Sequence, residues 1–199
     1  MPSFATRRIG YAMRSRQANA GDLMKTTDGG QTWRRVGSPC RKGWGGYGWA
    51  ASISFVSPIR GWLICMGQPG AGQQSKAVYK TSSGGATWKR LVNDYFEPGR
   101  IRLGGMRGGY PRGINFARGG NGLLWSVRGD AYRTGDGGRH WRPISATSPG
   151  VREGLSGWLV SHRVGYLLVQ NDSMARDWEL LRTGNGGRTW RRVHSWPRR

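Results

Sequence analysis

An eight-residue motif occurs four times along the chain, and this repeat constrains the fold more than any other feature of the sequence. Successive copies are about 50 residues apart, and a period of that length indicates stacked structural units that bury their apolar faces against one another. The copies align without gaps: Thr26–Trp33 (TTDGGQTW), Thr81–Trp88 (TSSGGATW), Thr134–Trp141 (TGDGGRHW) and Thr183–Trp190 (TGNGGRTW).

A second pattern precedes each motif and keeps step with it. It is an apolar residue, a glycine six positions later, and then a short apolar run typical of a buried strand. We therefore expect four strands in each repeat: strand A ends near the apolar residue, strand B follows the glycine, and strands C and D flank the motif. The four pairs are Phe4 with Gly10, Phe55 with Gly61, Phe116 with Gly122, and Leu159 with Gly165.

Four strands in about 50 residues is the size of a propeller blade. We predict an all-β fold, a β-propeller of four four-stranded blades, in a single domain over residues 1–199. The blades are expected at approximately 1–37, 50–92, 113–145 and 156–194. Because four blades are few for a closed propeller, three arrangements stay open: a closed four-bladed ring, a larger ring shared by self-associating chains, or part of a longer propeller.

The motif has a physical logic as a hairpin turn between strands C and D. Its Gly-Gly pair permits positive φ angles, and the residue before the pair can accept hydrogen bonds from the turn's own amides. Asp28 and Asp136 suit that role, Asn185 does so through its amide, and Ser83 suits it least. The Trp beyond the turn is an apolar anchor that we expect to pack between neighbouring sheets. These anchors are Trp33, Trp88, Trp141 and Trp190.

In their residue order these motifs resemble the Asp-box (BNR) repeats of bacterial sialidases, sortilin-type propellers, and photosystem II assembly and stability factors. The order Thr-x-Asp-Gly-Gly-x-Thr-Trp after a Phe-and-Gly strand pair is most similar to the assembly-factor group. The resemblance implies a propeller fold, but the matching residues are structural in all of these families. For function it implies a non-catalytic binding or assembly scaffold whose partner is a protein with an acidic surface.

Function in a propeller is expected in the long connections at the end away from the boxes, which we call the top face. The predicted D-to-A connections at 37–52 and 92–113 carry basic and aromatic side chains among glycines, which suits contact with an anionic macromolecule. Alternatively, the aromatic residues of the first connection fill the top of a narrow ring. The candidate binding residues are Arg41, Lys42, Trp44, Tyr47, Trp49, Arg100, Arg102, Arg107, Tyr110 and Arg112.

The charge balance favours an anionic partner. The chain has 32 Lys and Arg against 10 Asp and Glu, a net charge of +22, which attracts acidic protein surfaces, nucleic acid and anionic glycans. A genome rich in G and C is an alternative cause of part of the arginine excess. A second basic set lies on strand D, where charge also protects an edge strand from unwanted pairing. Its members are Arg34, Arg35, Lys89, Arg90, Arg142, Arg191 and Arg192.

Two alternative functions stay open: nucleic-acid binding through the basic and aromatic loops, and glycoside hydrolysis, which the sialidase resemblance raises. That chemistry needs an arginine cluster, a Tyr nucleophile and a carboxylic acid/base. Arginine is abundant here, but the predicted top loops contain few carboxylates. The Phe-Arg-Ile-Pro motif of sialidases is absent, and the segment 57–60 (SPIR) resembles it only superficially. We therefore expect no enzymatic activity and no cofactor.

Cys40 and Cys65 are the only cysteines, and the predicted blades bring both to the top of the interface between the first two blades. A disulfide suits that placement and would indicate an oxidising compartment; two separate buried thiols are the alternative. His140, His162 and His194 lack metal-ligand spacing, so no metal is expected. Without a long apolar run or a signal peptide, the chain is expected to be cytoplasmic, or extracytoplasmic if a leader was removed.

Overall fold

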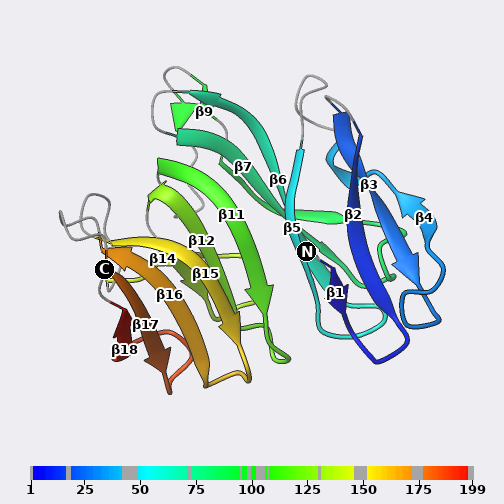
Figure 1. Cartoon of the computed structure of the whole chain (residues 1–199). Helices are drawn as coiled ribbons and strands as arrows, with labels where there is room; N and C mark the ends of the chain where they lie inside the picture. The colour runs from blue at the N-terminus through cyan, green and yellow to red at the C-terminus, as the bar shows by residue number, and fades with distance from the viewer. Residues whose placement is uncertain are drawn as a thin grey trace.

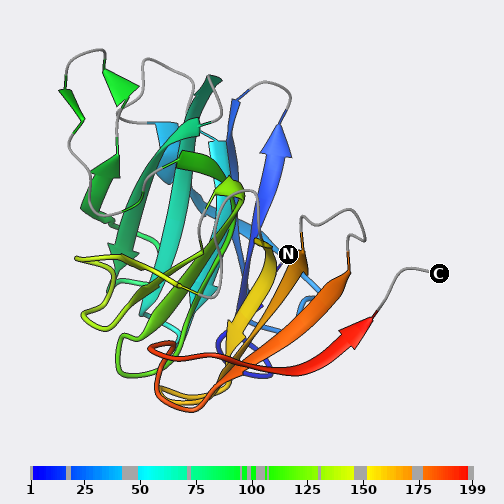
Figure 2. The ribbon, with the colours of Figure 1, turned by 90° about the vertical axis from the view of Figure 1, so that its left-hand side faces the viewer.

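The chain forms four antiparallel four-stranded sheets, which lie side by side around a common axis as the blades of a β-propeller (Figures 1 and 2). The computed structural model describes residues 2–16, 19–41, 49–70, 73–94, 96–97, 100–101, 106, 108–129, 131–145, 152–171 and 177–196. Strands make up nearly all of the regular structure in this part of the chain, and the one exception is a short 3-10 turn.

Each blade contains four strands that are consecutive in the chain. Blade 1 contains β1 (Ser3–Phe4), β2 (Gly10–Arg16), β3 (Asn19–Thr26) and β4 (Arg34–Gly37). Blade 2 contains β5 (Trp49–Phe55), β6 (Gly61–Gly70), β7 (Gln73–Thr81) and β8 (Lys89–Asp94). Blade 3 contains β11 (Gly108–Phe116), β12 (Gly122–Gly129), β13 (Tyr132–Thr134) and β14 (Arg142–Pro143). Blade 4 contains β15 (Arg152–Leu159), β16 (Gly165–Asn171), β17 (Trp178–Thr183) and β18 (Arg191–Trp196).

Three smaller features connect the blades. The 3-10 turn η1 (Pro39–Arg41) follows β4, and the short strands β9 (Phe96–Glu97) and β10 (Arg100–Ile101) pair with each other between blades 2 and 3. One parallel bridge, from Gly109 to Gln73, joins β11 to β7. Blades 2 and 3 therefore share a continuous sheet of eight strands.

Several strands extend further toward the top face than the sequence predicts, because their hairpins continue to pair. Gly70 pairs with Gln73 at the end of the β6–β7 hairpin, so residues 68–70 and 73–76 belong to strands. Strand A also begins earlier than expected: Trp49 opens β5, and Tyr110 and Arg112 lie within β11. The prediction that these three residues belong to long loops is wrong.

The pairing of an apolar residue with a glycine six positions later has a steric cause. In blade 2 the ring of Phe55 lies over Gly61, where an added Cβ atom would come within 2.5 Å of the ring. Phe116 covers Gly122 in blade 3 with the same 2.5 Å approach. Only glycine lets the ring that ends strand A cover the start of strand B. The pattern therefore reports a contact within each blade.

The Asp box folds as a hairpin turn that its own side chains hold. In blade 1 the Thr26 hydroxyl donates to the Asp28 carboxylate (2.7 Å) and accepts the amide of Gly30 (2.9 Å). The carboxylate also accepts the amide of Thr32 (3.0 Å), and the Trp33 indole N–H donates to the Gly30 carbonyl (3.0 Å). Both box glycines have positive φ in all four copies, as the turn requires.

Two boxes lack the aspartate and keep the same turn. The Ser83 hydroxyl oxygen accepts the amide of Thr87 (2.9 Å), and the Asn185 side-chain oxygen accepts the amide of Thr189 (2.9 Å). The turn therefore requires an oxygen acceptor at this position, which a carboxylate, an amide or a hydroxyl supplies.

Neighbouring blades pack face to face. Between blades 1 and 2 the ring of Tyr11 stacks on Phe55, with centroids 3.5 Å apart. Between blades 2 and 3 Trp62 stacks on Phe116 at 3.9 Å, and its indole N–H donates to the Gly137 carbonyl (2.8 Å). The core between blades 3 and 4 is mainly aliphatic and includes Leu123, Leu159, Leu167 and Leu181.

The outward faces of the first and last blades are less covered. Phe4 in blade 1 is 45% exposed, whereas the equivalent Phe55 is 5% exposed. Trp33 packs edge-on against Phe4 at 6.2 Å and, among the described residues, joins none of the cores between blades. The expectation that all four box rings lie between sheets therefore fails for Trp33. Large exposed side chains on blade 4 include Trp158, Trp178 and Trp196.

The arrangement of the blades is that of an open arc in the described part of the chain. Blade 1 packs on blade 2, blade 2 on blade 3, and blade 3 on blade 4, whereas the strands of blades 1 and 4 make no comparable contact. The two exposed outward faces are the faces that a closing contact would cover.

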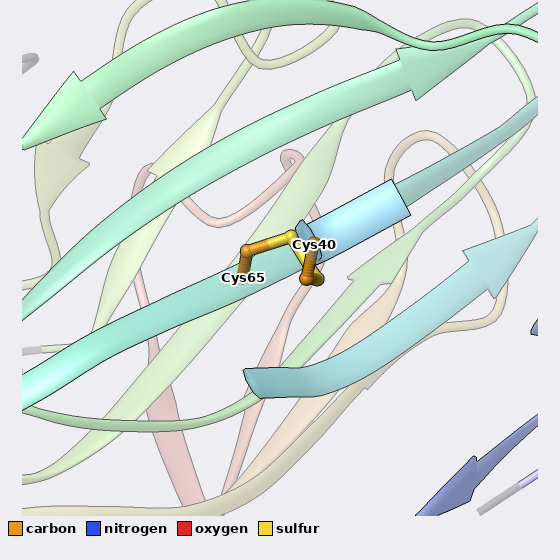
Figure 3. The surroundings of a disulfide bond; sticks show 2 residues. All are labelled: Cys40 and Cys65. Atoms are coloured by element: carbon orange, nitrogen blue, oxygen red, sulfur yellow. A yellow bond between two sulfur atoms is a disulfide. The ribbon is translucent and has the colours of Figure 1, made fainter. Parts of the chain in front are cut away.

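A disulfide joins Cys40 in η1 to Cys65 in β6 (Figure 3), with Cα atoms 5.6 Å apart. Both cysteines are buried in the core between blades 1 and 2, together with Tyr11 and Phe55. Because η1 follows the last strand of blade 1, the bond ties the end of that blade to the second strand of the next. This is the pairing that the blade assignment predicts.

Candidate binding site at the propeller axis

Of the ten residues predicted to bind a partner, the structure describes some with their side chains, some by their backbone alone, and some not at all. Tyr110 and Arg112 have described side chains; Tyr110 is half-buried and Arg112 is exposed, and both lie on β11. Three have only a described backbone: Arg41 in η1, Trp49 at the start of β5 and Arg100 at the start of β10. Five lie outside the described residues: Lys42, Trp44, Tyr47, Arg102 and Arg107.

The first strands of the four blades line the axis, and side chains fasten each to the next. The hydroxyl oxygen of Ser3 accepts the amide of Phe55 (2.8 Å), and that of Ser54 accepts the amide of Phe116 (2.9 Å). These bonds link residues 52 and 62 positions apart. They hold the inner strands of blades 1 to 3 at a fixed spacing, because an amide buried near the axis needs an acceptor.

Asn115 continues this series by accepting the amide of Leu159 (2.7 Å) through its side-chain oxygen. In sequence, each acceptor stands immediately before the apolar residue that ends strand A. That regularity is visible in the sequence as Ser, Ser and Asn before Phe4, Phe55 and Phe116, but our sequence analysis did not identify it.

A cavity of about 690 Å³ occupies the axis between these strands. Its wall combines hydroxyl, amide and aromatic side chains with one cation, and it draws on the first strand of every blade. Its volume falls within the range of about 300–1,000 Å³ typical of ligand sites. The lining side chains with functional groups are Ser52, Ser54, Arg112, Asn115, Trp125 and Trp158.

Arg112 stands at a bulge in β11, where the pairing with β12 shifts register between Pro111 and Gly113. Bulges re-aim side chains and occur often at binding sites. Blades 2 and 4 have the same register shift at the equivalent position, around Ala51 and Leu155. Of these three bulged residues only Arg112 is charged, so the repeat brings a single cation to the cavity by this route.

Trp125 forms an aromatic wall of the cavity, and its position depends on glycine at two neighbouring sites, Gly113 and Gly157. A Cβ atom at Gly113 would lie 1.9 Å from the Trp125 ring, and one at Gly157 would lie 3.3 Å from it. The indole therefore lies close to the inner strands of both blade 3 and blade 4. An aromatic face beside an arginine can hold the apolar and charged parts of one ligand.

Among the described residues that line the axial cavity there is no carboxylate. Two buried acids are instead paired with cations of strand D. Asp22 accepts a hydrogen bond from Arg35 (2.8 Å), and hydrogen bonds from Ser38 and Arg35 hold the pKa of its carboxyl well below its usual range. Glu179 pairs with Arg192 at 3.3 Å. These two members of the strand D set have structural partners.

No three His, Cys, Asp or Glu side chains in the described part of the chain lie together in a way that could hold a metal ion. The described part also has no helix of the length and apolarity needed to cross a membrane.

Four-stranded blades around an axial cavity define a β-propeller, and the comparison with solved structures agrees. The chain is similar to an oligogalacturonate lyase from Vibrio parahaemolyticus, with 10% identity and a TM-score of 0.60 over 96% of this chain and 50% of the lyase. It is similar to an ancestral enzyme of glycoside hydrolase family 74, with 16% identity and a TM-score of 0.53 over 96% of this chain and 26% of that one. A structure described as YCF48 bound to D1 peptide matches with 17% identity, a TM-score of 0.49 and coverage of 96% and 80%.

The likenesses to the lyase and to the family 74 enzyme show the fold alone. The chain spans about half the length of the lyase and about a quarter of the family 74 enzyme; identity this low does not transfer function. No protein-family model and no curated protein sequence matches the chain.

Proposed function

We propose that this protein is a non-catalytic binding scaffold that takes an acidic segment of a protein partner into the axial cavity. The observation that carries the proposal is the placement of Arg112, the one charged side chain among the described residues that line the cavity. An arginine in such a setting forms a charge-assisted, bidentate contact with a carboxylate. The net charge of +22 supports this by attracting an acidic chain before contact.

The composition of the cavity favours binding over hydrolysis. A glycosidase places at least one carboxylic acid/base beside the scissile bond, and the described residues that line this cavity include no Asp or Glu. Its hydroxyl and amide groups at Ser54 and Asn115 already accept backbone amides, which assigns them a structural role. Arg112 and the faces of Trp125 and Trp158 are the groups that we propose contact the partner.

The test is the binding of a fluorescein-labelled octaglutamate peptide, followed by anisotropy, with octaglutamine as the uncharged control. We expect the acidic peptide alone to bind, with an affinity that falls as salt screens the charges. Arg112→Gln should weaken binding about tenfold, which is the expected loss for one charge-assisted contact.

Arg34→Gln is the matched control, because it removes the same charge from an exposed position on β4. The proposal requires this variant to bind the peptide nearly as well as the unchanged protein. Equal losses from both variants would show that the charge acts diffusely without a site at the axis. Turnover of a fluorogenic sialidase substrate that disappears when one top-face carboxylate is changed would overturn the non-catalytic assignment.

A further inference from the structure

Strand C of every blade carries a basic residue directly before the threonine that opens the box. Lys80 shows what this position does: its ammonium group lies 5.4 Å from the Trp62 ring centroid and 3.9 Å from where a Cβ atom of Gly137 would stand. The cation of blade 2 thus reaches across to the box of blade 3. The four residues are Lys25, Lys80, Arg133 and Arg182.

A cleft of about 320 Å³ surrounds Lys80 at the end of the propeller that carries the boxes, which we call the box side. Arg60 from the A-to-B turn of blade 2 and Arg139 from the box of blade 3 also line it. Burial, and then repulsion from Arg60 and Arg139, lowers the pKa of Lys80. Arg60 and Arg139 are therefore close enough to oppose the charge of Lys80.

A second cleft of about 300 Å³ lies on the other side of the same box. Arg133 of blade 3, Arg142 of β14 and Arg188 of the blade 4 box line it. Burial, followed by repulsion from Arg142 and Arg188, lowers the pKa of Arg133. The box of blade 3 thus separates two clefts, each with three cations.

Among the described residues that line the two clefts, the one carboxylate is Asp136, and hydrogen bonds within its own box already engage it. It accepts hydrogen bonds from the Thr134 hydroxyl (2.8 Å) and from the amides of Arg139 (3.0 Å) and His140 (3.1 Å). Among the described residues, the six cations of the two clefts form no ion pair with a carboxylate. The clefts therefore retain an excess of positive charge that a bound anion would relieve.

We infer that the box side of blade 3 binds a phosphate-bearing polyanion, with one phosphate group in each cleft. Arginine forks and a lysine ammonium are the groups that bind phosphate oxygens, and two adjacent clefts fit a ligand that carries more than one such group. The aromatic ring in the first cleft, Trp62, is only 1% exposed, so this site offers no platform for stacking bases. It therefore recognises charge and spacing, with no dependence on base sequence.

The experiment is titration calorimetry with inorganic tripolyphosphate, with inorganic phosphate as the single-group comparison and a thymidine octanucleotide as a second polyanion. We expect tripolyphosphate to bind at least about tenfold more tightly than phosphate, since linked groups bind the second cleft intramolecularly. The double variant Lys80→Gln/Arg133→Gln should lose at least about tenfold in tripolyphosphate affinity.

Because Lys80 and Arg133 also pack between blades, a second pair keeps the test independent of folding. Arg60→Gln/Arg188→Gln changes one exposed residue in each cleft and should show a loss of similar size. The matched control, Arg34→Gln/Arg191→Gln, removes the same two charges from exposed positions on strand D. It should change the affinity less than about twofold, which is within the range of diffuse electrostatics.

Equal losses from the cleft pairs and the control pair would overturn the site, as would equal affinities for tripolyphosphate and phosphate. If the octanucleotide depends on the same cleft residues, the site is supported and its ligand is a nucleic-acid backbone; if only tripolyphosphate does, the ligand is a free polyphosphate. Octaglutamate binding through Arg112 is measured separately, so failure at either site is distinguishable from failure at the other.

Discussion

Removal of the Trp62 side chain is the most direct test of how the blades hold together. Trp62 is 1% exposed, stacks on Phe116 at 3.9 Å, and donates its indole N–H to the Gly137 carbonyl at 2.8 Å. One side chain thus supplies both the apolar contact and a hydrogen bond between blades 2 and 3. Tyr166 occupies the same repeat position in blade 4, where it is half-buried on the outward face.

Trp62→Ala should lower the free energy of unfolding by about 3–5 kcal/mol, the usual cost of truncating a buried aromatic residue. Trp62→Phe keeps a ring against Phe116 but removes the donor to Gly137, so it should cost about 1–3 kcal/mol. Tyr166→Ala should cost about 1 kcal/mol, because less apolar surface is removed from burial. The difference between equivalent positions isolates the contribution of the neighbouring blade.

Guanidinium denaturation measures these free energies of unfolding. The transition is followed by far-ultraviolet circular dichroism in place of fluorescence, because the loss of a Trp changes the fluorescence signal itself. The three variants should retain similar slopes against denaturant, which indicates that the same surface is exposed on unfolding. Equal costs for Trp62→Ala and Tyr166→Ala would refute the idea that blade packing supplies the stability. If Trp62→Phe does not lower the free energy of unfolding, the hydrogen bond from Trp62 to the Gly137 carbonyl does not contribute to stability.

Two further predictions concern the boxes and the disulfide. Hydrogen bonds, chiefly from Thr32, hold the pKa of the Asp28 carboxyl well below its ordinary value. Burial raises the pKa of Asp136, but hydrogen bonds, led by the one from the His140 amide, outweigh burial and hold this pKa at about 2. Because these folded-state pKa values lie below those of the unfolded chain, the two carboxylates stabilise the fold fully above about pH 5, and this stabilisation is lost as the pH falls toward 2. In the double variant Asp28→Asn/Asp136→Asn, the free energy of unfolding should therefore depend less on pH between those limits. Reduction of the Cys40–Cys65 bond, which closes a loop with a sequence separation of 25, should lower the unfolding free energy by about 3–4 kcal/mol, measured by urea denaturation with and without dithiothreitol.

The blades were predictable from the sequence because the two repeated patterns encode contacts that are local. The Gly-Gly pair reports positive φ angles in a hairpin, and the glycine after Phe55 reports the ring that covers it. Each pattern lies within one hairpin, so a single sequence displays both the cause and the residues involved. The same assignment brought Cys40 and Cys65 together but left a disulfide and two separate buried thiols open, and the structure shows the disulfide.

The candidate site was less predictable, because its geometry depends on details that have no local pattern. Arg112 reaches the axial cavity through a bulge, and a bulge depends on how two strands pair. The clefts on the box side combine residues from three blades, such as Arg60, Arg139 and Arg188. Periodicity predicts that such turns share one end of the propeller, but it does not predict which cations face a common space.

The inner strands limit how a further sheet could pack on the outward face of blade 4, because the contacts that join the first four blades are not repeated there. Ser3, Ser54 and Asn115 each accept an amide from the next blade, but the equivalent residue of blade 4 is Trp158, which has no acceptor. Its ring stacks on Tyr166 at 5.4 Å, on the side where earlier blades receive the ring of their neighbour. A sheet that packed on blade 4 would therefore have to displace the indole and satisfy its own inner amide. A closed four-bladed ring that used the contacts of the other three interfaces meets the same obstacle, because Phe4 would need the position that Trp158 holds.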